Sequence, residues 1–105
     1  MINSIDFDDI MRQILTIAAP TRIYLFGSYA KGIPTSNSDI DLCIVFPDSE
    51  KHVDLSSIRL SLVKCQKALD LIAFSEQEFN DQQTIWWSIP SQVLQEGVKL
   101  YERAA

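Results

Sequence analysis

The chain has 105 residues, of which 47% are hydrophobic and 22% are charged, and its formal net charge at pH 7 is −5. This length is that of one compact domain, and the composition is ordinary for a globular protein and unlike that of a disordered chain. The acidic balance disfavours a long nucleic-acid ligand, because such binding depends mainly on Lys and Arg that neutralise phosphates. We therefore expect a single domain over residues 1–105 that binds no long nucleic acid.

The sequence carries no signal for a membrane or for export. No apolar run reaches the ~20 residues that a membrane-spanning helix needs, and the N-terminus lacks the basic start of a signal peptide. We therefore expect a cytoplasmic protein without membrane contact. The two cysteines, Cys43 and Cys65, lie in apolar-periodic segments without the paired spacing of a zinc or redox site, so buried free thiols are expected.

The chain begins with a predicted helix and a predicted strand. Residues 5–19 repeat apolar side chains at helical spacing behind Ser4, a candidate cap, and Pro20 ends the pattern. Residues 22–26 are aromatic and β-branched and run into a glycine, which predicts a strand that ends in a turn. A short helical turn is expected next, through residues 29 and 30.

The middle of the chain predicts a loop and then a strand, a helix and another strand. Residues 31–38 are rich in glycine, proline and small polar side chains, as surface loops are. Residues 39–46 form a strand that is acidic at its start and apolar on both faces beyond it. Asp54 is a candidate cap for a helix over residues 55–67, and residues 69–74 predict a third strand.

The last third of the chain begins as a polar segment at Ser75. A last helix or turn is expected to reach Gly97, followed by a short strand over residues 98–101. This order of elements predicts an α/β (α+β) fold in which a small mixed β-sheet is flanked by helices.

Several aromatic residues are expected in the core of this fold. Trp86 and Trp87 are adjacent, so one is expected in the core and the other is a candidate exposed anchor for a partner, because tryptophan is enriched at binding hot spots. The other aromatic side chains expected in the core are Tyr24, Phe26, Phe46 and Phe74.

Three aspartates lie at the starts of two predicted strands that are otherwise apolar. Alternation puts Asp39 and Asp41 on one face, with their Cα atoms roughly 6 to 7 Å apart, and a neighbouring strand ~4.8 Å away would add Asp70. Like charges this close raise one another's pKa unless a divalent cation holds them ionised. The aspartates therefore predict a metal site.

All-oxygen ligands favour Mg²⁺, with Mn²⁺ as the second choice. Two such ions would activate an attacking oxygen and stabilise a leaving phosphate, which is the chemistry of nucleotidyl or phosphoryl transfer. Asp39 and Asp41 would hold the ions. Asp70 would also bind metal, and it would either take the proton of the acceptor or polarise the acceptor toward alkoxide.

Gly27 and Ser28 are the candidate phosphate-binding residues. A glycine lets the backbone approach a phosphate closely, and amides at a helix start together with the Ser28 hydroxyl can donate to its oxygens. Lys31 is either a further cationic contact or a solvated loop residue.

These residues resemble a known family. Gly27-Ser28, ten residues and then Asp39-Ile40-Asp41 reproduce the G-S-x10-D-x-D signature of the DNA polymerase beta-like nucleotidyltransferase superfamily. Asp70, in Leu69-Asp70-Leu71, resembles the third carboxylate of that superfamily.

In size and arrangement the chain is similar to the minimal nucleotidyltransferases, antitoxins paired with a HEPN-domain ribonuclease toxin. The resemblance implies transfer of AMP from ATP to a tyrosine of the toxin, and a hetero-oligomer with it. It implies that Gly27 and Ser28 bind nucleotide and that Asp39, Asp41 and Asp70 bind metal and act in catalysis. Lys31 departs from the arginine that many relatives carry.

Two other functions remain open at this point. The fold can serve as a non-catalytic antitoxin that only binds and occludes its partner, although three clustered carboxylates without metal would cost stability. It can also transfer a nucleotide to a small molecule such as an aminoglycoside.

Overall fold

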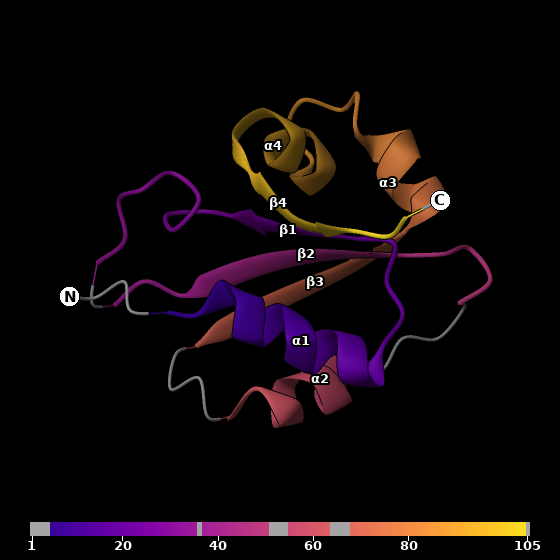
Figure 1. Ribbon diagram of the computed structural model, residues 1–105. Coiled ribbons are helices and arrows are strands. Elements are labelled where there is room, and N and C mark those ends of the chain that lie inside the picture. Colours follow the sequence, from indigo (N-terminus) through magenta and orange to yellow (C-terminus); the bar gives the residue numbers. More distant parts are fainter. Residues whose placement is uncertain (1–4, 36, 51–54, 64–67, 105) are drawn as a thin grey trace.

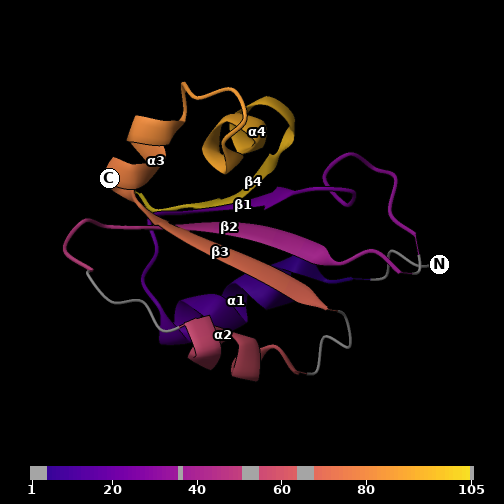
Figure 2. The same ribbon diagram turned by 180° about the vertical axis from the view of Figure 1, so that it is seen from behind.

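A four-stranded mixed sheet lies between two pairs of helices (Figure 1), in a computed structural model that describes residues 5–35, 37–50, 55–63 and 68–104. Figure 2 shows the same layers from behind, with α1 and α2 on one face of the sheet and α3 and α4 on the other. In chain order the elements are α1 Phe7–Ile17, β1 Arg22–Phe26, β2 Ile40–Phe46, α2 Leu55–Ser61, β3 Leu69–Ser75, α3 Glu76–Gln82, α4 Ile89–Glu96 and β4 Val98–Glu102.

The strands lie in the order β3-β2-β1-β4. β1 pairs antiparallel with both β2 and β4, whereas β2 pairs parallel with β3 through the crossover that contains α2. This arrangement confirms the predicted fold class. The four predicted strands are all present, and their bounds differ from the predicted ones by at most one residue.

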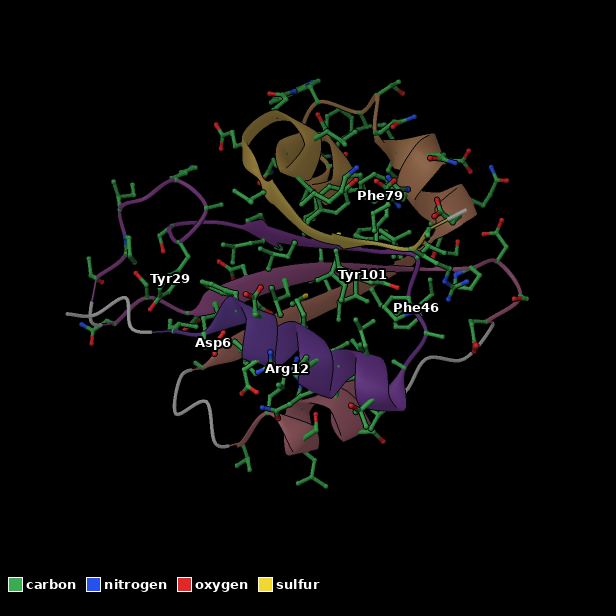
Figure 3. All side chains as sticks on the ribbon, in the orientation of Figure 1. Asp6, Arg12, Tyr29, Phe46, Phe79 and Tyr101 are labelled. Carbon is green, nitrogen blue, oxygen red and sulfur yellow. The ribbon has the colours of Figure 1, made fainter. Side chains whose placement is uncertain are left out.

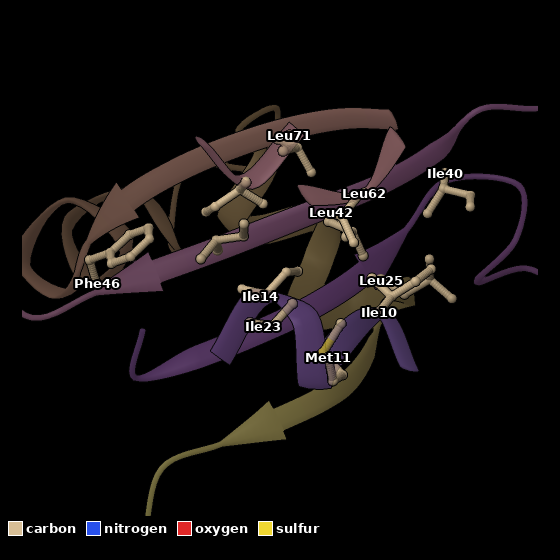
Figure 4. Close-up of a cluster of buried hydrophobic side chains, with 12 residues drawn as sticks. Ile10, Met11, Ile14, Ile23, Leu25, Ile40, Leu42, Phe46, Leu62 and Leu71 are labelled. Atoms are coloured by element: carbon tan, nitrogen blue, oxygen red, sulfur yellow. The ribbon is translucent and has the colours of Figure 1, made fainter. Parts of the chain in front are cut away.

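Alternation along the central strands β1 and β2 supplies two hydrophobic cores. The larger core lies against α1 and α2 (Figure 4) and consists of Ile10, Met11, Ile14, Ile23, Leu25, Ile40, Leu42, Ile44, Phe46, Ile58, Leu62 and Leu71. The smaller core lies against α3 and α4 and consists of Tyr24, Cys43, Val45, Phe79 and Val93. Both faces of β2 are therefore buried, as its apolar sequence predicted.

The predicted first helix is shorter at both ends than expected. The side chain of Asp6 accepts a hydrogen bond from the amide of Asp9, so Asp6 is the cap of α1. The candidate cap Ser4 lies outside the described residues. The helix ends at Ile17, because Ala18 takes an extended conformation two residues before Pro20.

The predicted helix over residues 55–67 is described only in part. Its helical span ends at Ser61, whose hydroxyl donates to the carbonyl of Ile58 and so competes for a helix acceptor. Ile58 and Leu62 are buried. The candidate cap Asp54 and Cys65 lie outside the described residues.

Helix α3 was not predicted, because its sequence was interpreted as a polar segment. A capping box starts it: Ser75 accepts from the amide of Glu78, while the Glu78 carboxylate accepts from the amide of Ser75. Its fully buried residue Phe79 (Figure 3) stacks on Tyr24, with ring centroids 5.6 Å apart.

The aromatic predictions are confirmed in part. Tyr24 and Phe46 are buried, and Phe26 and Phe74 are partly buried against the smaller core. Both tryptophans are exposed, so the prediction that one of them lies in the core is wrong. They lie in a turn between two short helices, in which Ser88 is the residue that faces the interior.

The prediction for Cys43 is confirmed, since its free thiol is buried, and burial raises the pKa of this thiol to about 12.

In the described part of the chain, no helix combines the length and the apolar character needed to cross a membrane.

An ion pair ties β1 to α3. Arg22 Nη2 lies 2.7 Å from Glu76 Oε2, and the guanidinium lies 4.6 Å from the centroid of the Phe79 ring. Burial alone would raise the pKa of Glu76, but hydrogen bonds from Thr21 and Arg22 outweigh it and hold that pKa below its ordinary value of 4.5. Ionised Glu76 therefore stabilises the fold.

The substitution Glu76→Gln should lower the free energy of unfolding at pH 7 by about 1–2 kcal/mol, because a partly buried Arg22 loses its counter-ion. The difference from wild type should disappear as pH falls from 4.5 through the lowered pKa of Glu76. Urea denaturation across pH measures it. Glu102→Gln, which breaks an exposed ion pair with Lys99, is the control and should cost less than about 0.5 kcal/mol at any pH.

Candidate active site

The structure brings the three predicted aspartates to one end of the sheet. Asp41 is the second residue of β2 and pairs in register with Asp70 of β3, while Asp39 stands two residues before Asp41. Alternation places all three on the sheet face that also carries Cys43 and Val45, which is the face covered by α3 and α4. Asp41 is half-buried, whereas Asp39 and Asp70 are exposed.

The carboxylates interact electrostatically. Burial, followed by the charges of Asp70 and then Asp39, raises the pKa of Asp41 above its ordinary value of 3.8. Within the described residues, no three acidic, His or Cys side chains already stand in the arrangement of a metal site. The aspartates are thus neighbours whose side chains still have to turn toward a common cation, and the predicted metal site remains a prediction.

Gly27 is required by the position of Asp41. The β1–β2 register sets Phe26 opposite Asp41, so the chain leaving β1 passes directly over the carboxylate. A Cβ atom on Gly27 would lie 2.1 Å from Asp41 Oδ2, and the φ angle of Gly27 is +78°. Any other residue would be strained by this φ angle, and its Cβ atom would also force the Asp41 carboxylate to move. The sequence analysis anticipated a close approach to phosphate here but missed this contact.

The predicted helical turn after Gly27 is present. The amide of Lys31 donates to the carbonyl of Gly27 at 3.1 Å, and the amide of Ile33 donates to the carbonyl of Ser28 at the same distance. Tyr29, labelled on this loop in Figure 3, packs its ring edge-on against Phe7 of α1, with centroids 6.3 Å apart. The turn that holds Ser28 is therefore anchored to α1.

Lys31, expected to be either a cationic contact or a solvated loop residue, lies beside α4. Its Nζ is 3.3 Å from Glu96 Oε2, and about half of each side chain is exposed. An exposed ion pair of this kind contributes little stability, so Lys31 can exchange its partner for a phosphate. Glu96 gave no signal in the sequence, because the contact joins segments 65 residues apart.

A cavity of about 710 Å³ lies elsewhere, at the opposite end of β2 and β3. Its lining includes Phe46 and Phe74 together with the acidic side chains of Asp48, Glu50 and Glu78. The cavity contains neither the Gly27-Ser28 turn nor any of the three aspartates, so it is not part of the candidate site.

Comparison with known proteins establishes the family. Residues 6–100 match the nucleotidyltransferase domain, and the chain belongs to that family. It is 42% identical over 81 residues to the "Putative protein adenylyltransferase MJ0604" of Methanocaldococcus jannaschii, an alignment that covers 76% of this chain and 77% of that protein. The chain is a nucleotidyltransferase, as its motif predicted.

Solved structures share the fold. A putative nucleotidyltransferase from Sulfolobus solfataricus superimposes with a TM-score of 0.57 at 21% identity, over 92% of this chain and 78% of that one. A toxin-antitoxin with AMP-PNP gives a TM-score of 0.66 at 23% identity, over 91% and 73% of the two chains. A mutant of the toxin-antitoxin MntA-HpeT gives 0.67 at 20% identity, over 93% and 74%.

The contact between Gly27 and Asp41 makes a paired test possible. Gly32 also has a positive φ angle, of +74°, but a Cβ atom there would meet nothing within 4 Å. Gly32→Ala should cost about 1–2 kcal/mol through backbone strain alone. Gly27→Ala should cost about 1–3 kcal/mol beyond that, because it displaces the carboxylate. Urea denaturation of both variants checks this, and equal losses would contradict the contact.

The charges that surround Asp41 predict that removing its own charge stabilises the metal-free protein. Because the pKa of Asp41 is raised, the folded protein holds this proton to a higher pH than the unfolded chain does. The ionised side chain therefore destabilises the metal-free fold at pH 7, and Asp41→Asn should raise the unfolding temperature in EDTA. The gain should shrink as pH falls through the raised pKa toward 3.8. A lower unfolding temperature for the variant at pH 7 would contradict the account.

Proposed function

We propose that the chain transfers AMP from ATP to a hydroxyl group of a partner protein in a Mg²⁺-dependent reaction. The observation that carries the proposal is the position of Gly27 directly over Asp41, with Asp70 in register beside it. The turn after β1, for which we propose phosphate binding, therefore lies at the same end of the sheet as the acids. The 42% identical relative named as a protein adenylyltransferase supports a protein acceptor.

The nucleotide would bind at the turn after β1. The amide of Ser28 and its hydroxyl would donate to phosphate oxygens, and the missing side chain of Gly27 keeps the backbone open to them. Lys31 would leave Glu96 and add a positive charge. The neighbour crystallised with AMP-PNP supports a nucleoside triphosphate as substrate.

The donor set fits a hard divalent cation. It is all oxygen, and burial and the neighbouring charges of Asp70 and Asp39 raise the pKa of Asp41, a cost that a bound cation would offset. Asp39, Asp41 and Asp70 would hold one or two Mg²⁺ ions. Bound there, such ions supply Lewis-acid stabilisation of the charge on the reacting phosphate.

The acceptor hydroxyl would attack the α-phosphorus of ATP. Its oxygen forms the new P–O bond while the bond from the α-phosphorus to the bridging oxygen breaks, and pyrophosphate leaves. The hydroxyl proton passes to the carboxylate of Asp70. This exposed side chain stands on the outer strand β3, where an incoming protein can reach it.

The partner would be a toxin that the modification silences, in a complex with this chain in the cytoplasm. Two of the structural neighbours are toxin-antitoxin complexes, which supports a toxin as partner. The family resemblance points more narrowly to a tyrosine of a HEPN-type ribonuclease.

The test is transfer of radiolabel from α-labelled ATP to a protein in native cell extract, followed on gels and located by mass spectrometry. Label should appear on one partner protein and be lost with EDTA. Asp39→Asn should slow transfer about 100-fold or more, because it removes a predicted metal ligand.

Asp8→Asn is the matched control, since it removes an exposed carboxylate on α1, which covers the sheet face opposite the aspartates, and it should transfer label at the wild-type rate. A partner that binds tightly yet stays unlabelled with every nucleotide would instead indicate an antitoxin that acts by binding alone. Label on a small molecule would instead indicate an enzyme whose acceptor is a small molecule.

A further inference from the structure

Two adjacent tryptophans stand in solvent on the turn between α3 and α4. Trp86 is 78% exposed and Trp87 is 66% exposed, and their rings meet edge to face with centroids 5.6 Å apart. Neither ring contributes to either hydrophobic core. Exposed pairs of large rings on a folded surface commonly mark a binding site.

The turn that carries the tryptophans is held by hydrogen bonds. The amide of Ile85 donates to the carbonyl of Gln82, and the amide of Ser88 donates to the carbonyl of Ile85, each at 2.9 Å. The buried Ser88 hydroxyl donates to Gln82 at 2.6 Å and accepts from the amide of Ser91. The rings are therefore presented by a preorganised backbone, which lowers the entropic cost of binding.

Exposed apolar side chains continue from the turn toward the active site. Leu94 on α4 is 48% exposed and Val98 at the start of β4 is 45% exposed. Val98 pairs with Leu25, two residues before Gly27. Helix α4 covers the same face of the sheet onto which the aspartates open (Figure 1). A protein lying along α4 would therefore approach the site from its open side.

The charge of this segment indicates the kind of partner. Residues 76–98 contain four acidic residues and no Lys, Arg or His. Glu76 pairs with Arg22 and Glu96 pairs with Lys31. Glu78 and Asp81 are exposed and have no cationic partner among the described residues. A second copy of the chain would bring acid against acid, which disfavours self-association through this surface.

We propose that the Trp86–Trp87 turn and the exposed side of α4 form the docking surface for the acceptor protein. The acceptor presents an apolar pocket for the tryptophans, rimmed by Lys and Arg that face Asp81, at the end of α3 from which the turn begins. This inference rests on the proposed function, since it names the surface through which the protein acceptor is held.

The first experiment measures label transfer to the purified acceptor by the full chain carrying Trp86→Ala and Trp87→Ala. The KM for the acceptor should rise about tenfold or more, because two hot-spot rings are lost. The affinity for ATP with Mg²⁺, measured by calorimetry, and the unfolding temperature should match wild type, because both rings are exposed. The control is Leu60→Ala, which removes an apolar side chain of 75% exposure from α2 on the opposite face.

The second experiment needs no transfer activity. The photoreactive residue p-benzoylphenylalanine replaces Trp87, or Leu60 as control, in the full chain expressed in its native cells. Irradiation should link position 87, and not position 60, to one other protein at a peptide rich in Lys or Arg, and added salt should reduce the yield.

The outcomes separate the two proposals. An unchanged KM in the tryptophan variant would overturn the docking surface and leave the proposed function standing. Crosslinks from position 87 only to a second copy of the chain, or to nothing, would also overturn it. A specific crosslink to a basic peptide without any label transfer would support the docking surface while the proposed function fails.

Discussion

The contact between the backbone of Gly27 and the carboxylate of Asp41 is the constraint on which the rest of the site depends. The antiparallel register of β1 and β2 sets Phe26 opposite Asp41, so any residue with a Cβ atom at position 27 would overlap the acid. The same register fixes the turn after β1, where phosphate binding is proposed, beside the acids, and the parallel register of β2 and β3 adds Asp70 from the neighbouring strand. The pairing of the strands thus fixes the positions of Gly27, Asp41 and Asp70 relative to one another.

This arrangement stores unfavourable electrostatic energy at one end of the sheet. Burial and neighbouring charge raise the pKa of Asp41, so its ionised form lowers the stability of the fold. The hydrophobic cores on both faces of β2 offset this loss. At the other end, Arg22 and Glu76 join β1 to α3 with a satisfied ion pair. The aspartates, which repel one another, lie where a nucleotide and cations are proposed to bind. The paired charges of Arg22 and Glu76 lie where their role is to stabilise the fold.

Much of the fold could be predicted because its signals are local. The apolar runs at residues 22–26 and 39–46 define the central strands, and the spacing between Gly27 and Asp39 identified the family that the comparisons then established. Helix α3 was missed although its capping box is a local signal, because its polar sequence offers one buried residue, Phe79. The Lys31–Glu96 pair joins segments remote in sequence, so it was not accessible to pattern analysis. Exposure was predicted for one tryptophan only, because the local turn that carries both rings was not predicted.

The most direct test of the account is a crystal structure of the protein with Mn²⁺ and a non-hydrolysable ATP analogue, in which anomalous scattering locates the metal. The account predicts manganese between Asp39 and Asp41, with the triphosphate on the backbone at Gly27 and Ser28. It also predicts that Lys31 has left Glu96. Nucleotide bound elsewhere, or manganese that contacts none of the three aspartates, would contradict the central claim that this end of the sheet is the catalytic site.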